Sequence, residues 1–115
     1  MLPAKNSLEL LNQINSEKLF IKLVEQLNKD LQLANITKSF KLSVSILELK
    51  SGLSKLLFDL ISHNYDDYLN LLYRIDVPEK ELATIKSNSL DESIEEVCFL
   101  VLKREFQKVW FKNRI

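Results

Sequence analysis

Apolar side chains recur every three or four residues along most of this chain, and this spacing constrains the fold more than any other feature of the sequence. In residues 16–35 they are Phe20, Leu23, Val24, Leu27, Leu31 and Ala34. In residues 46–61 they are Ile46, Leu49, Leu53, Leu56, Leu57, Leu60 and Ile61. Residues spaced in this way share one face of an α-helix. The spacing therefore predicts two amphipathic helices whose apolar faces must be covered by other elements.

The composition also favours helices. The 115 residues include only one glycine and two prolines, whereas hairpin-rich β proteins need residues that adopt left-handed backbone conformations at their tight turns. With 46% hydrophobic and 28% charged residues, the chain has the balance of a globular protein. We predict one all-α domain over residues 1–115, a bundle of four to five main helices with a long, largely buried C-terminal helix.

The first helix boundary is open to two interpretations. Leu8, Leu11 and Ile14 indicate a short helix that either precedes the helix over 16–35 or runs into it. Ser16 is the expected N-cap of the longer helix, because its hydroxyl can accept a hydrogen bond from a free backbone amide.

Ser45 and Glu48 predict the start of the next helix. Their spacing is that of a capping box, in which each side chain bonds the backbone amide of the other residue. This helix should end near Asn64. Gly52 lies inside it, and we interpret this glycine as tolerated rather than as a site of close packing.

Residues 40–46 have a different period. Phe40, Leu42, Val44 and Ile46 alternate with polar residues, as in a half-buried strand. A lone strand would leave its backbone groups without partners, and no other segment alternates convincingly. We therefore prefer a loop and leave the strand open as an alternative.

Two further helices are expected in the second half of the chain. Asn64 can cap a helix whose inward stripe is Tyr65, Tyr68, Leu69, Leu72 and Ile75. Pro78 should bend the chain and begin a short helix toward Ile85. A polar connection follows over 86–88, and Ser89 with Glu92 forms a second capping box before the last helix, whose apolar part runs from Ile94 to Trp110.

Catalytic and cofactor motifs are not found. His63, the one histidine, falls near the end of a predicted helix, where it can interact with free carbonyl groups. Cys98, the one cysteine, lies among apolar residues and is expected to be buried, which argues against a Cys–His nucleophile. A lone buried thiol also suits a reducing compartment.

Metal and phosphate sites have no signature either. Gly52 stands alone, so there is no glycine-rich phosphate loop, and the histidines and cysteines needed for zinc or di-metal sites are missing. One group of carboxylates could in principle form an acid–base or cation-binding site: Asp66, Asp67, Asp76, Glu79 and Glu81. Favourable interaction with helix dipoles and a role in solubility are sufficient to explain these residues. We expect no cofactor, no metal and no enzymatic activity.

Charge is segregated along a chain whose formal net charge is zero. The net charge is 0 in residues 1–35, +3 in 36–58, −4 in 59–81, −3 in 82–96 and +4 in 97–115. Acids at the start and bases at the end of the last helix suit its dipole, which explains part of the pattern. The rest of the charge pattern indicates complementary acidic and basic faces.

The C-terminal segment combines cations with aromatic residues, a mixture that binds acidic partners or single-stranded nucleic acid. Phe106, Val109 and Trp110 continue the apolar face of the last helix and are expected in the core. The candidate partner-binding residues are Lys108, Phe111, Lys112, Arg114 and Ile115.

These observations favour a non-enzymatic helical interaction module, regulatory or structural, that binds another protein or itself. The alternative is nucleic-acid binding through the basic C-terminal segment. We expect no membrane partner, because the longest apolar run covers only 97–102, and we expect a cytoplasmic location.

Overall fold

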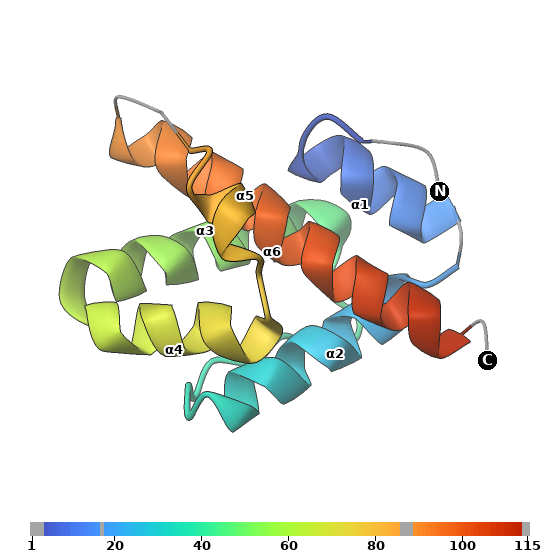
Figure 1. The fold of residues 1–115 in the computed structure, drawn as a ribbon. Coiled ribbons are helices and arrows are strands. Elements are labelled where there is room, and N and C mark those ends of the chain that lie inside the picture. The colour runs from blue at the N-terminus through green and yellow to red at the C-terminus, as the bar shows by residue number, and fades with distance from the viewer. Residues whose placement is uncertain (1–3, 17, 86–88, 114–115) are drawn as a thin grey trace.

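Six helices make up the described part of the chain (Figure 1). A computed structural model describes residues 4–16, 18–85 and 89–113. The helices are α1 (Ser7–Ser16), α2 (Phe20–Leu33), α3 (Ile46–His63), α4 (Tyr65–Ile75), α5 (Glu79–Leu82) and α6 (Leu90–Asn113). No strand occurs in these ranges, so the predicted all-α bundle is confirmed. None of the helices within them combines the length and the apolar character that crossing a membrane requires.

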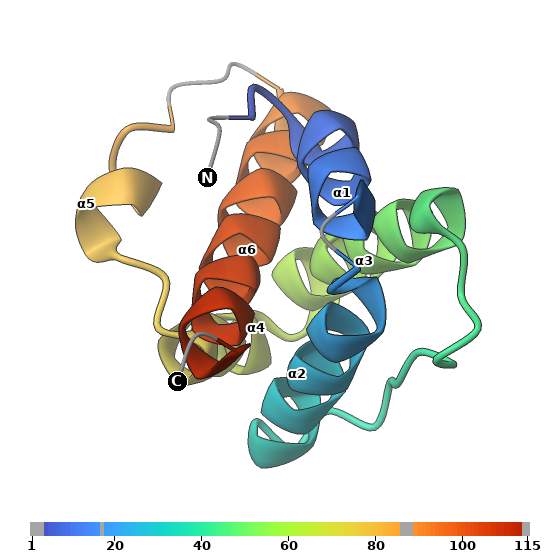
Figure 2. The ribbon, with the colours of Figure 1, turned by 90° about the vertical axis from the view of Figure 1, so that its right-hand side faces the viewer.

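The long helix α6 lies at the centre of the bundle and contacts each of the other five helices. In Figure 1 α6 runs in front of α3, with α1 above it and α2 and α4 below it, and in Figure 2 α5 lies on the opposite side of α6 from α1 and α2. Its buried residues recur every three or four positions and are Ile94, Val97, Cys98, Val101, Leu102, Glu105, Phe106 and Val109. One stripe of α6 therefore supplies the middle of the core.

The predicted cap of the second helix is wrong. Ser16 is the last residue of α1, where its hydroxyl donates a hydrogen bond to the Gln13 carbonyl at 2.7 Å. The chain then turns at Lys18, which has a left-handed φ of 60°. Leu19 occupies the N-cap position of α2 without a side-chain hydrogen bond. Two separate helices result, because the left-handed residue ends the first before the second begins.

The predicted boundaries of α3 are confirmed. Ser45 and Glu48 form both hydrogen bonds of the capping box, and Asn64 follows the last residue of the helix. Asn64 also precedes α4, but its side chain bonds the Asp67 carboxylate instead of a backbone amide.

The expected inward stripe of α4 is partly wrong. Tyr68, Leu72 and Ile75 are buried as expected, but Tyr65 and Leu69 are exposed. The reason is that α4 packs against α2, α3 and α6, which turns the buried face toward Leu71 and away from these two side chains. Leu71 itself is fully buried.

Residues 40–45 form a loop, which agrees with the interpretation preferred from the sequence. The side chain of Asn28 in α2 explains how this loop is held without a strand partner. It donates a hydrogen bond to the Phe40 carbonyl and accepts one from the Phe40 amide, both at 2.8 Å. A neighbouring strand would supply the same pair of bonds.

The interpretation of Gly52 as merely tolerated is wrong. A Cβ atom at this position would lie 2.7 Å from Cε1 of the Phe40 ring, which is closer than carbon atoms normally approach. The loop therefore packs its one buried aromatic ring directly onto the glycine in α3. Only a residue without a side chain leaves room for it.

The segment after Pro78 forms α5, shorter than the helix expected toward Ile85. The predicted connection over 86–88 lies outside the described residues. Ser89 accepts a hydrogen bond from the Glu92 amide at 3.2 Å at the start of α6. The predicted core positions Phe106 and Val109 are buried.

Gly52→Ala should destabilise the protein by about 1–3 kcal/mol, because the new methyl group must displace the Phe40 ring. In an unconstrained helix the same change would stabilise by about 1 kcal/mol. Urea denaturation measures the change in the free energy of unfolding. The matched control is the same change in a Phe40→Leu background, where the loss should shrink, and equal losses in both backgrounds would contradict this account.

Candidate functional site

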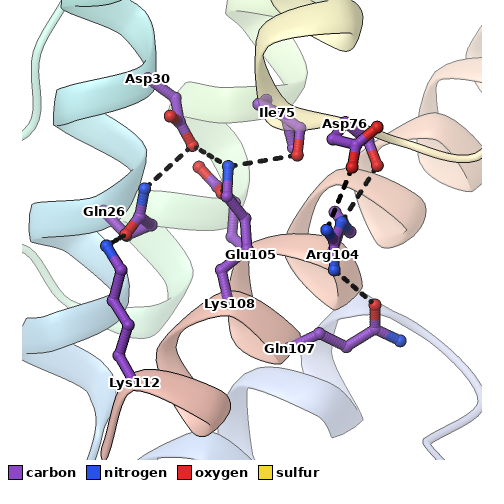
Figure 3. A network of polar contacts seen from close by, with 9 residues as sticks. All are labelled: Gln26, Asp30, Ile75, Asp76, Arg104, Glu105, Gln107, Lys108 and Lys112. Carbon is purple, nitrogen blue, oxygen red and sulfur yellow. Dashed lines mark hydrogen bonds and ion pairs between the residues drawn. The ribbon is translucent and has the colours of Figure 1, made fainter.

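Three of the five candidate partner-binding residues lie in the described part of the chain, all on α6. Lys108 is partly buried, whereas Phe111 and Lys112 are exposed near the end of α6. Arg114 and Ile115 lie outside the described residues. The two lysines take part in a polar network inside the bundle (Figure 3).

Lys108 is the centre of this network. Its ammonium lies 2.7 Å from the Asp30 carboxylate and 3.3 Å from the Glu105 carboxyl, and it donates a hydrogen bond to the Ile75 carbonyl at 3.1 Å. The side chains of Asp30 and Glu105 are 4% and 0% exposed. One cation therefore serves oxygen atoms from α2, α4 and α6 in a site that water barely reaches.

Glu105 is held in its protonated form. Burial raises the pKa of Glu105 to about 9, and the nearby Asp30 adds to the shift. Lys108 opposes the shift without cancelling it. Neither Glu105 oxygen accepts a well-aligned hydrogen bond from the described residues. A protonated Glu105 leaves one carboxylate, that of Asp30, facing one ammonium.

The other cations of α6 are also engaged within the molecule. Lys112 donates to Gln26 at 2.6 Å, and Gln26 in turn contacts Asp30. Arg104 bonds the carboxylate and the backbone carbonyl of Asp76 (Figure 3). Lys103 lies 3.5 Å from Glu81.

These contacts join charge blocks that are far apart in the sequence. The basic block 97–115 pairs with the acidic block 59–81 through Arg104 and Lys103. The basic block 36–58 pairs with the acidic block 82–96 through Lys50 and Glu95, 3.0 Å apart. The opposite charges thus face each other within one molecule.

The remaining chemistry-bearing side chains are not gathered into one site. Cys98 is fully buried, and burial raises the pKa of its thiol, which disfavours the reactive thiolate. His63 is exposed at the last position of α3. Among the residues that the structure describes, no three His, Cys, Asp or Glu side chains are grouped closely enough to hold a metal ion.

A surface that the sequence did not predict lies along α4. Two adjoining hollows, with volumes of about 440 and 500 Å³, share Leu69, Leu72 and Leu82. The first is also lined by Ile85 of the segment after α5 and by Leu90 of α6, and the second by residues from Tyr73 to Glu79. We call the two hollows together the α4 groove.

Three large, exposed side chains of α4 line this groove. Tyr65, Leu69 and Tyr73 are 54%, 47% and 79% exposed and follow one another at intervals of four residues. We call them the α4 stripe. Their spacing places them on one side of the helix. The sequence could have predicted an exposed apolar surface on α4, because this helix has more apolar residues than one buried stripe requires.

Removing the partly buried cation Lys108 should destabilise the protein strongly. Lys108→Met leaves the Asp30 carboxylate buried without its partner, and we expect a loss of about 3–5 kcal/mol. Lys112→Met is the matched control on the same helix. Lys112 is exposed, so its loss should cost about 1 kcal/mol or less. Urea denaturation at pH 7 measures both, and similar losses would contradict the assignment.

Glu105 should make stability depend on pH. Its native pKa is raised from the ordinary 4.5 to about 9, so the folded protein binds more protons than the unfolded chain between these values. The free energy of unfolding should therefore fall as pH rises from about 5 to 8, by roughly 1 kcal/mol per pH unit.

Glu105→Gln is neutral at every pH and should remove this dependence. The variant should be more stable than the parent at pH 8. Denaturation curves from pH 5 to 8 test this, with Glu95→Gln at an exposed position as the control. An unchanged slope in Glu105→Gln would rule out a protonated native Glu105.

Comparison with protein-family models, with curated proteins and with solved structures finds no match to this chain.

Proposed function

We propose that the protein is a non-enzymatic helical interaction module that binds a partner protein through the α4 groove. The observation that carries the proposal is the exposed α4 stripe beside an apolar groove. Scattered exposed apolar residues are common, but a contiguous apolar surface with a hollow marks a site of interaction. This surface differs from the C-terminal set expected from the sequence.

The shape of the surface suits a helix of the partner. Tyr65 and Tyr73 are eight residues apart, which corresponds to about 12 Å along the axis of α4. An amphipathic helix of two to three turns can lay its apolar face along such a length, with anchors spaced three and four residues apart. The shared residues Leu69, Leu72 and Leu82 would contact those anchors.

The C-terminal candidate residues remain a prediction with less support. A partner or a phosphate backbone that recruited Lys108 would have to take it from Asp30 and Ile75. Phe111 is exposed, whereas Lys112 would have to leave Gln26. Nucleic-acid binding therefore stays an alternative without a structural observation in its favour.

The proposed setting of the module is the cytoplasm. Its support is Cys98, a free thiol buried in the core and therefore suited to a reducing compartment.

A library of displayed amphipathic helical peptides tests the function directly. We expect enrichment of peptides that bind the parent protein and lose at least about tenfold in affinity for Leu69→Glu, which places a charge in the middle of the groove. Leu47→Glu is the matched control, because Leu47 is 66% exposed on α3 and lines neither hollow. Both sites are exposed, so both variants should fold.

Two results would overturn the proposal. The first is a library that yields no binder. The second is a set of binders whose affinity is unchanged by Leu69→Glu, which would place the docking surface elsewhere.

A further inference from the structure

We infer that the partner segment that fits the α4 groove is a positively charged amphipathic helix. This inference rests on the proposed function and adds the chemistry of the partner. It is carried by the carboxylates around the groove together with the exposed tyrosines of the α4 stripe.

Of the exposed acids near the apolar surface, Glu79 lines the groove, and three others neighbour groove-lining residues in the sequence. Asp66 follows Tyr65 directly in α4, and Glu79 lines the groove at the start of α5. Asp91 and Glu92 follow Leu90, which lines the groove at the start of α6. All four are exposed.

These four carboxylates differ from the other acids near α6. Asp76 and Glu81 are already paired with Arg104 and Lys103. By contrast, no ion pair joins Asp66, Glu79, Asp91 or Glu92 to another residue in the described ranges. Their charge is available to a partner.

Two cations in the same segment reduce the negative potential without removing it. Arg74 and Lys80 are exposed, on α4 and α5. Residues 59–81 carry a net charge of −4, which becomes −2 once Asp76 and Glu81, already paired with Arg104 and Lys103, are set aside. A helix with lysine or arginine beside its apolar anchors would therefore meet a favourable potential at the rim of the groove.

The tyrosines favour the same partner. Tyr65 and Tyr73 present exposed rings at the two ends of the stripe. The face of an aromatic ring attracts lysine and arginine, so each ring can pack against an apolar anchor and contact a neighbouring cation. An acidic helix would lack these contacts and would be repelled by the carboxylates.

A second copy of this chain is a poorer occupant. The described cations of α6 that would meet the acidic rim are engaged with Asp30, Asp76, Glu81 and Gln26 of their own molecule. Docking α6 in trans would require those contacts to be given up. Helix α6 of a second copy is therefore a poorer occupant than a cationic helix of a different protein.

Two synthetic 18-residue helical peptides provide the test. They carry the same leucine and tryptophan anchors, and their polar faces are lysine and glutamine in one and glutamate and glutamine in the other. Fluorescence anisotropy measures binding at low and high salt. We expect the lysine peptide to bind about tenfold more tightly at low salt, with an advantage that shrinks as salt is added, because exposed charges are screened.

Neutralising the rim should reduce this preference. Asp66→Asn combined with Glu79→Gln should weaken binding of the lysine peptide by roughly threefold to tenfold. The matched control is Glu9→Gln with Glu25→Gln, two exposed acids on α1 and α2 that change the net charge equally. This control should leave the affinity nearly unchanged.

Failure of this inference is distinguishable from failure of the proposed function. If both peptides bind equally and Leu69→Glu abolishes both, the groove is a docking site without a preference for positive charge, and the inference is overturned. Tighter binding of the glutamate peptide would also overturn it. If neither peptide binds, or if Leu69→Glu has no effect, the proposed function falls together with the inference. A dimer of the parent protein that is abolished by Leu69→Glu would assign the groove to a second copy instead.

Discussion

The packing of α6 against every other helix is the constraint on which the rest of the structure depends. A helix that touches five neighbours has to use most of its surface for internal contacts. Its apolar stripe fills the core, and the long side chains beside that stripe reach across to α2, α4 and α5. The central position of α6 thus decides which cations remain available to other molecules.

The same constraint explains the segregated charge of the sequence. Blocks of opposite sign lie far apart along the chain but meet at Lys50 and Glu95, at Lys103 and Glu81, and at Arg104 and Asp76. Exposed ion pairs of this kind contribute little to stability. They do, however, engage the bases of α6 within the molecule, whereas Asp66 and Glu79 form no ion pair within the described residues.

The sequence predicted the helices well because helix periodicity and capping are local. The capping box at Ser45 and Glu48, and the end of α3 before Asn64, depend on residues close together in the chain. The start of α2 was predicted incorrectly because a left-handed turn at Lys18, a residue that gives no signal for it, separates it from α1. Local patterns alone do not reveal such turns.

Features that depend on contacts between distant segments could not be predicted. Gly52 is required by Phe40, whose position depends on Asn28 in another helix. The exposure of Tyr65 and Leu69 depends on how α4 is rotated against its neighbours. The burial of Glu105 could have been predicted, because this residue falls on the apolar stripe of α6. Its proximity to Asp30 could not, because Asp30 lies 75 positions earlier in the chain.

We propose that the outer side of α4 is where this protein meets its partner. Nuclear magnetic resonance tests this proposal residue by residue when a helical peptide that binds is titrated into the isotopically labelled protein. The account predicts amide shift changes concentrated in residues 65–73, 79–85 and 90–97. Changes concentrated in α2 or at the end of α6, with α4 unaffected, would contradict it.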